Sequence, residues 1–83
     1  MRRRCILLTV EQSDLLMVIA TQVKRLRAKR GLTQEKLSER AGLHRTFISN
    51  VELGKRDLSV LSLRQICSAL GVSIGELFEG TEI

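Results

Sequence analysis

The fold of this chain is decided by one stretch, TQEKLSERAGLHRTFISNVE, which runs from Thr33 to Glu52. Thr33 is a favourable N-cap because its hydroxyl can accept a hydrogen bond from a free amide of the first helical turn. Gly42 can adopt the left-handed backbone that ends a helix and begins a sharp turn. The stretch therefore predicts two short helices, at about residues 34–41 and 45–53, in a helix-turn-helix arrangement.

The second of these helices has two chemically different faces. Ile48 and Val51 are three residues apart and are predicted to face the core. The outward side chains are those of Arg45, Thr46, Ser49 and Asn50. Arginine suits guanine, asparagine suits adenine, and threonine can donate, accept or contact a thymine methyl. The outward face is therefore predicted to contact the base edges and phosphates of DNA.

Three further helices are predicted around this pair, over about residues 13–30, 59–70 and 73–79. The first has apolar residues at three- and four-residue spacing, which indicates a stripe facing the core. Ser13 and Ser59 can cap the first two, and Ser73 with Glu76 forms a capping box for the last. The chain is thus predicted to be all-α.

The domain organisation follows from these helices. Residues 1–12 form a basic, partly apolar arm that is given no structure, and three alternatives stay open for it: disorder, a short strand paired with a partner, or contact with DNA. Residues 13–83 are expected to form one domain that binds DNA and dimerises, since 83 residues suffice for a single modest core.

Positive charge is concentrated where the helix-turn-helix lies. The chain has a formal charge of +5 at pH 7, and residues 24–56 hold ten Lys or Arg against three acidic residues. Residues 57–83 hold one Arg against four acidic residues. One half of the protein is therefore predicted to face a polyanion. With two Phe and no Trp or Tyr, the chain lacks the aromatic platforms on which single-strand binders stack bases.

Two cysteines and one histidine limit the other kinds of site. Cys5 and Cys67 are too few for a disulfide scaffold, and Cys67 lies on an apolar helical face, which indicates a buried thiol in a reduced, cytoplasmic protein. No metal, cofactor or small-molecule ligand is expected, because the ligands for a metal site are missing. No apolar run is long enough to span a bilayer, so no membrane partner is expected.

The wider sequence resembles the Cro/repressor-type helix-turn-helix family, also called the XRE family. The resemblance rests on LRAKRGLTQEKL at residues 26–37, AGL at 41–43, IS at 48–49, ELG at 52–54 and LGVS at 70–73. It covers about residues 22–79 and implies a compact five-helix, lambda-repressor-like DNA-binding domain. Within the family, LHRTFIS at 43–49, followed by Glu52 and RDLS at 56–59, is most similar to the controller proteins of restriction–modification systems.

The resemblance implies roles for particular residues. In such domains the third helix lies in the major groove with its first turn at the base edges, so base contacts are expected from Arg45, Thr46 and Asn50. Phe47 either contacts a thymine methyl or packs behind the turn, and the DNA side is favoured because Ile48 already fills the inward position. Phosphate contacts are expected from Gln34, His44, Ser49, Lys55 and Arg56. Arg27 and Glu52 are expected to form a partly buried structural ion pair.

A homodimer is expected because one domain of this size reads too few bases to be selective. Dimeric readers place two recognition helices one turn of DNA apart on a pseudo-palindrome. The C-terminal helix carries large apolar groups that mark a partner surface, and the expected interface consists of Ile74, Leu77, Phe78 and Ile83. Leu77 can instead fill the core, which leaves Phe78 as the better interface residue.

These expectations converge on a sequence-specific transcriptional regulator, bacterial or phage, that binds a palindromic operator in double-stranded DNA. An autoregulatory restriction–modification controller ranks above a phage-type repressor and above the antitoxin of a toxin–antitoxin pair. A protein-interaction module without DNA specificity is the alternative from a different class. RNA polymerase is a further candidate partner. The chain offers no nucleophile–base set or paired carboxylates, so it is not expected to be an enzyme.

Overall fold

Five helices and their connections make up the described part of the chain. The computed structural model describes the backbone of residues 2–80 and the side chains of residues 15–80. The helices are α1 (Arg2–Lys29), α2 (Gln34–Ala41), α3 (Arg45–Glu52), α4 (Val60–Leu70) and α5 (Ile74–Leu77). Residues 2–80 contain no strand, which confirms the all-α prediction. None of these helices is long and apolar enough to cross a lipid bilayer.

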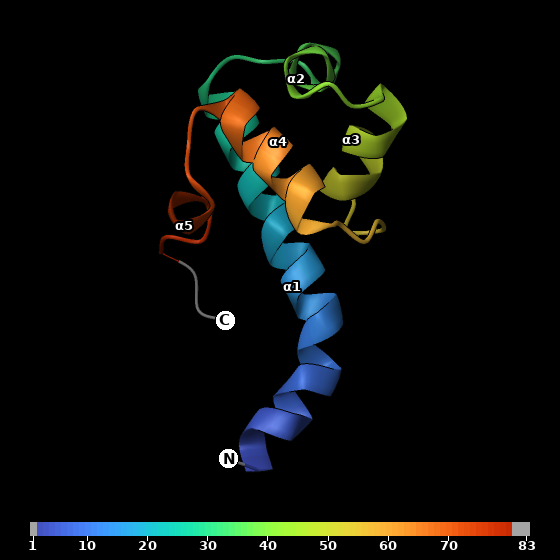
Figure 1. The fold of residues 1–83 in the computed structure, drawn as a ribbon, viewed down its shortest axis with the longest axis vertical. Coiled ribbons are helices and arrows are strands. Elements are labelled where there is room, and N and C mark those ends of the chain that lie inside the picture. The colour runs from blue at the N-terminus through green and yellow to red at the C-terminus, as the bar shows by residue number, and fades with distance from the viewer. Residues whose placement is uncertain (1, 81–83) are drawn as a thin grey trace.

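The long first helix, α1, sets the shape of the molecule. Its 28 residues correspond to about 42 Å of helix, and the longest dimension of the fold is 42 Å. The other helices gather around its C-terminal half, while its N-terminal half extends past them (Figure 1). The predicted helix start at Ser13 is therefore wrong, since α1 begins at Arg2. Residues 2–13 contain no Gly or Pro, and a capping serine does not prevent helical residues before it.

The turn between α2 and α3 forms as the sequence predicts. Thr33 Oγ1 accepts from the Lys36 N–H at 3.0 Å, which caps the start of α2. Gly42 has a φ of +72°, and the next amide, of Leu43, donates to the Ser38 carbonyl at 3.0 Å. A residue with a Cβ rarely adopts this backbone. Gly42 therefore ends α2 and sends the chain directly into α3.

The predicted capping box at the start of α5 is also present. The Glu76 N–H donates to Ser73 Oγ at 3.0 Å, and the Ser73 N–H donates to Glu76 Oε1 at 2.8 Å. These reciprocal bonds satisfy two amides that the short helix leaves without intrahelical partners. The cap fixes where α5 begins, and α5 ends after Leu77, slightly before the predicted end near residue 79.

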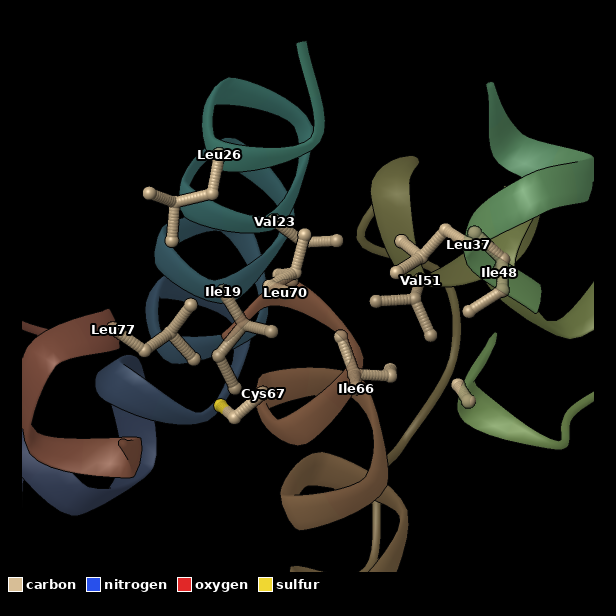
Figure 2. Packing of buried hydrophobic residues seen from close by; sticks show 11 residues of the cluster. Ile19, Val23, Leu26, Leu37, Ile48, Val51, Ile66, Cys67, Leu70 and Leu77 are labelled. Atoms are coloured by element: carbon tan, nitrogen blue, oxygen red, sulfur yellow. The ribbon is translucent and has the colours of Figure 1, made fainter. Parts of the chain in front are cut away.

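All five helices contribute to one hydrophobic core. Figure 2 shows buried side chains from all five helices between the ribbons, including Leu37 of α2. The buried cluster consists of Ile19, Val23, Leu26, Leu37, Ala41, Ile48, Val51, Ile66, Cys67, Leu70 and Leu77. Close packing of α2 and α3 against the other helices holds the helix-turn-helix as a rigid unit.

The core assigns different roles to the four residues that were predicted to form a dimer interface. Leu77 is 0 % exposed, so the alternative in which it fills the core is confirmed. Its inclusion among the interface residues is wrong, because its whole side chain packs inside the monomer. Ile74 and Phe78 are half-buried at the edge of the cluster. Ile83 lies outside the described residues.

Three helix C-termini are closed by side chains from other parts of the chain. Gln22 Nε2 donates to the Leu77 carbonyl at 2.6 Å, and Arg30 Nε donates to the Leu70 carbonyl at 2.8 Å. Gln65 Nε2, from α4, donates to the Ala41 carbonyl at 3.3 Å. These bonds satisfy carbonyls that helices leave free at their ends. The last one fixes α4 beside the turn that leads into α3.

Candidate nucleic-acid interface

The third helix, α3, has one face in the core and one face outside. Ile48 is completely buried and Val51 is 2 % exposed. Arg45 and Thr46, in the first turn, are exposed, while Ser49 and Asn50 are half-buried. The residues predicted to point outward therefore do so most strongly at the N-terminal end of α3.

His44 caps the start of this helix. Its Nδ1 accepts from the Thr46 N–H at 3.0 Å, and the residue has an extended backbone just before the first helical turn. A neutral imidazole that accepts at Nδ1 carries its hydrogen on Nε2, so Nε2 remains a donor toward the outside. The capping role was not predicted because serine, threonine, aspartate and asparagine are the usual N-caps.

A buried polar network joins α3 to α1 and α2. Arg27 Nε donates to Glu52 Oε2 at 2.6 Å, and Arg27 Nη2 donates to Glu52 Oε1 at 3.0 Å. Arg27 Nη1 donates to the Leu32 carbonyl at 2.8 Å. Gln34 Nε2 also donates to Glu52 Oε1, at 3.0 Å. The ion pair that the resemblance implies is thus part of a larger arrangement, in which one carboxylate receives donors from two helices.

Burial and charge make this network a rigid connection between α3 and the helices α1 and α2. The side chain of Glu52 is 2 % exposed and that of Arg27 is 19 % exposed. The hydrogen bond to Glu52 raises the pKa of the Arg27 guanidinium above its ordinary value, so Arg27 stays charged across the working range of the protein. Such two-point pairing fixes orientation as well as distance. The network therefore fixes the C-terminal end of α3 relative to α1.

The same network positions Gln34, a predicted phosphate contact. Its amide nitrogen carries two hydrogens, and Glu52 receives one of them. Gln34 is half-buried at the first position of α2, where free backbone amides and the helix dipole favour an anion. The bond to Glu52 uses one of the two amide hydrogens and leaves the other outside the network.

The chain turns back along α3 directly after the helix ends. Gly54 has a φ of +72°, and the Lys55 N–H donates to the Asn50 carbonyl at 3.0 Å. The Gly54 N–H donates to the Val51 carbonyl, also at 3.0 Å, which completes a Schellman-type helix end. The turn brings Arg56 back beside α3, where its Cζ lies 4.8 Å from the centre of the Phe47 ring.

An open hollow brings together several of the predicted DNA contacts. It has a volume of about 420 Å³, and it is lined by Leu43, His44, Thr46, Phe47, Asn50, Arg56 and Ser62. Arg45, Gln34, Ser49 and Lys55 lie outside it. Ser62 was not predicted, since it belongs to α4 and no local pattern links it to α3. The hollow shows that the outer side of α3 is bordered by the following loop and α4.

The positive charges around this surface are available to bind an anion. Among residues 15–80 the ion pairs are Arg27 with Glu52 and Lys36 with Glu39. Arg45, Lys55 and Arg56 are exposed and belong to neither pair. Three unpaired cations within and directly after α3 raise the positive potential on one side of the molecule.

Comparisons with known proteins agree with this geometry. A helix-turn-helix family model matches residues 23–77. The chain is 36 % identical to the uncharacterised HTH-type transcriptional regulator y4dJ of Sinorhizobium fredii, over 83 % of this chain and 90 % of that protein. It is 35 % identical to the control protein C.MunI of a Mycoplasma species, over 84 % and 96 % of the two chains.

A solved structure with the same fold is that of the wild-type restriction–modification controller protein C.Esp1396I. It has a TM-score of 0.74 and 38 % sequence identity, and the match covers 78 % of this chain and 86 % of that one. The helix-turn-helix, its outward face and its network to α1 all lie within the part that the family model matches. This chain therefore belongs to the helix-turn-helix family of transcriptional regulators.

Proposed function

We propose that this chain is a sequence-specific, double-stranded-DNA-binding regulator that acts as a homodimer on a pseudo-palindromic operator, as the autoregulatory controller of a restriction–modification system. The observation that carries the proposal is the exposed first turn of α3, with Arg45 and Thr46 beside unpaired cations. In this role the protein works in the cytoplasm through binding, without catalysis.

Relatives support the controller assignment. Proteins similar to this chain over most of both lengths include the control proteins C.MunI and C.BamHI. C.Esp1396I is known as a tetramer in complex with its natural 35 base-pair operator and bound to a 19 base-pair duplex. Solved variants of that protein replace an arginine, a threonine and a tyrosine at three consecutive positions. Arg45, Thr46 and Phe47 present the same order of arginine, threonine and aromatic ring.

Three side chains of α3 are proposed to contact bases. Arg45 is exposed and can donate two parallel hydrogen bonds to one guanine. Thr46 lies beside it, and Asn50 follows one turn later at the wall of the hollow. Each suitable pair of this type discriminates against a wrong base by about 1–3 kcal/mol. Phe47 differs from these three because its ring is half-buried and lies beside Arg56.

Phosphate contacts are proposed to frame the recognition helix. Gln34 donates one amide hydrogen to Glu52 and keeps a second donor, whereas His44 accepts at Nδ1 from the Thr46 N–H and keeps Nε2 as its donor. Lys55 and Arg56 bring exposed charge from the loop after α3, and Ser49 offers a hydroxyl on the helix itself. Contacts of this kind fix the position of the domain on the duplex, whereas base contacts select the sequence.

The homodimer is proposed to form at the C-terminal end of the domain. Ile74 and Phe78 are half-buried, so part of each side chain can contact a second copy. The buried bond from Gln22 to the Leu77 carbonyl holds α5 against α1. The interface would therefore keep a constant position relative to α3, as two half-sites one helical turn apart require.

The decisive experiment compares two duplexes, the DNA upstream of the gene and a shuffled sequence of equal composition, across a range of salt concentrations. We expect much tighter binding of the upstream DNA, a steep loss of affinity with salt, and a footprint of two symmetric halves. Equal and weak binding of both duplexes would overturn the proposal. Protection of only one half of the site would overturn the homodimer but not the sequence-specific binding.

A further inference from the structure

We infer that Phe47 acts on DNA through Arg56. The ring holds the guanidinium in place by stacking, and the stacked pair binds, as one unit, a backbone phosphate beside the first turn of α3. The inference rests on the proposed DNA-binding function and gives Phe47 a positioning role in place of a base contact. The observation behind it is the approach of Arg56 Cζ to 4.8 Å from the centre of the Phe47 ring.

Phe47 is held in place on its inner side. It is half-buried and packs against the edge of the hydrophobic core. Its neighbour Ile48 is completely buried, which fixes the rotation of α3. The Phe47 N–H donates to the His44 carbonyl at 3.0 Å, so the backbone at this position is part of the first helical turn. The ring is therefore a firm support for a group that lies on it.

Arg56 makes its described side-chain interaction with the ring of Phe47. It is exposed, and it belongs to neither of the ion pairs in residues 15–80. The helix end at Gly54 and the bond from the Lys55 N–H to Asn50 turn the chain back toward Phe47. A long arginine side chain without a partner would sample many rotamers, and ordering it on binding would cost affinity.

Stacking leaves the donors of Arg56 available. A cation within about 6 Å of a ring centre is attracted by the ring. The guanidinium is planar, with five N–H donors around its edge, so a phosphate can still bind at that edge while the flat side contacts Phe47. Both residues line the same hollow as Thr46 and Asn50, so the gripped phosphate would lie next to the bases that these side chains contact.

The distinguishing measurement is the salt dependence of binding to a short mixed-sequence duplex. Removing one phosphate-neutralising charge lowers the slope of log affinity against log salt by about one, and this is expected for Arg56→Ala. Phe47→Leu removes no charge, but it should also lower that slope and weaken binding by about two- to five-fold, the amount that an exposed cation–π contact contributes. A Phe47 that only contacts bases would leave the slope unchanged.

A double-mutant cycle tests whether the two residues act as one. Adding Phe47→Leu to Arg56→Ala should have no further effect on affinity or slope, because the group that Phe47 positions is gone. Adding Phe47→Leu to Lys55→Ala, the matched control from the neighbouring position, should have its full effect. Independent effects of Phe47→Leu and Arg56→Ala would overturn the inference.

Two further measurements separate this result from misfolding and from loss of the proposed function. Phe47→Tyr keeps the aromatic face and should keep the slope of the unmutated protein, while thermal unfolding shows whether Phe47→Leu is folded. In the protein without DNA, the ring current of Phe47 should shift the Arg56 side-chain protons upfield, and Phe47→Leu should abolish that shift. An absent shift overturns the stacking, whereas intact stacking with no binding of any duplex overturns the proposed function and the phosphate role.

Discussion

The two ends of α3 differ in almost every physical respect, although they are only seven residues apart. Glu52, at the C-terminal end, is 4 % exposed and accepts hydrogen bonds from Arg27 and Gln34. Arg45, at the N-terminal end, is exposed and belongs to no ion pair of the described residues. One end joins the helix to the rest of the protein, and the other end is available to a partner.

This difference shows how an eight-residue helix can recognise a sequence. A helix this short has little stability of its own, so its exposed end can be accurate only if its buried end is fixed. The network at Glu52 provides that fixation to α1, and the cap at His44 orders the first turn. Loss of DNA binding is therefore expected from substitutions at either end, for different reasons.

The largest expected effect comes from breaking the buried end. Glu52→Ala leaves the Arg27 charge without its partner, which costs about 3–5 kcal/mol in comparable cases. For a domain of this size we expect the Tm to fall by more than about 10 °C, as measured by circular dichroism. Glu52→Ala that melts like the unmutated protein would contradict a structural role for the network.

A paired replacement controls for the loss of a partner. Arg27→Met combined with Glu52→Leu removes both charges together, and apolar pairs of similar volume often replace such ion pairs without loss. We expect this double variant to be more stable than Glu52→Ala alone. If the double variant is the less stable protein, the bond from Arg27 to the Leu32 carbonyl must contribute more to stability than the unpaired Arg27 charge costs.

At the exposed end we expect a loss of selectivity without a loss of stability. Arg45→Ala should reduce the preference for the upstream DNA over a shuffled duplex by about 5- to 150-fold, which corresponds to about 1–3 kcal/mol. The Tm should stay the same, because the side chain is exposed. Arg64→Ala is the matched control, since it removes the same charge from the exposed side of α4. Equal loss of preference in both variants would show that only net charge matters.

A smaller effect is expected at His44, which both caps α3 and is a proposed phosphate contact. His44→Ala should lower stability by about 1 kcal/mol through loss of the N-cap, and should also weaken binding to any duplex. His44→Ser keeps a capping oxygen but is too short to reach outward, so it should restore the stability without restoring the affinity. Full recovery of affinity in His44→Ser would leave capping as the only role of this residue.

The smallest expected effect is a dependence of stability on alkaline pH. Burial raises the pKa of the Cys67 thiol, so the folded state holds this proton more tightly than the unfolded chain does. The stability that results is complete below the ordinary thiol pKa and is lost as the pH rises through the raised value. Unfolding in urea across this range should show the decline, and Cys67→Ala should lack it. Substitutions at the exposed residues of α3 should leave this pH dependence of stability unchanged.

The local features of the fold could be predicted because their causes are local. Thr33, Gly42 and the pair Ser73–Glu76 set helix ends through bonds to residues within five positions. The apolar spacing of Ile48 and Val51 likewise predicts which side of α3 is buried. His44 is the local feature that was missed, because an imidazole seldom serves as an N-cap.

Two other features were not decided by the local pattern that was used to predict them. The sequence left Leu77 between the core and an interface, and the structure buries it completely among residues of other helices. The start of α1 was placed at Ser13 on the strength of a capping preference, whereas the helix continues to Arg2. The burial of Leu77 depends on packing against distant helices, whereas the start of α1 is local, since residues 2–13 contain no Gly or Pro and a capping serine does not prevent helical residues before it.

The sequence by itself determined the helix-turn-helix, its outward chemistry and the basic half of the molecule, because turn residues, helical periodicity and charge are properties of short segments. Only the tertiary structure decided that Gln34 shares a carboxylate with Arg27 and that Arg56 lies on Phe47. These contacts join residues that are brought together by packing and by the turn at Gly54. Since such contacts set the orientation of the proposed DNA-binding side chains, the fold determines how the surface that the sequence predicts is arranged.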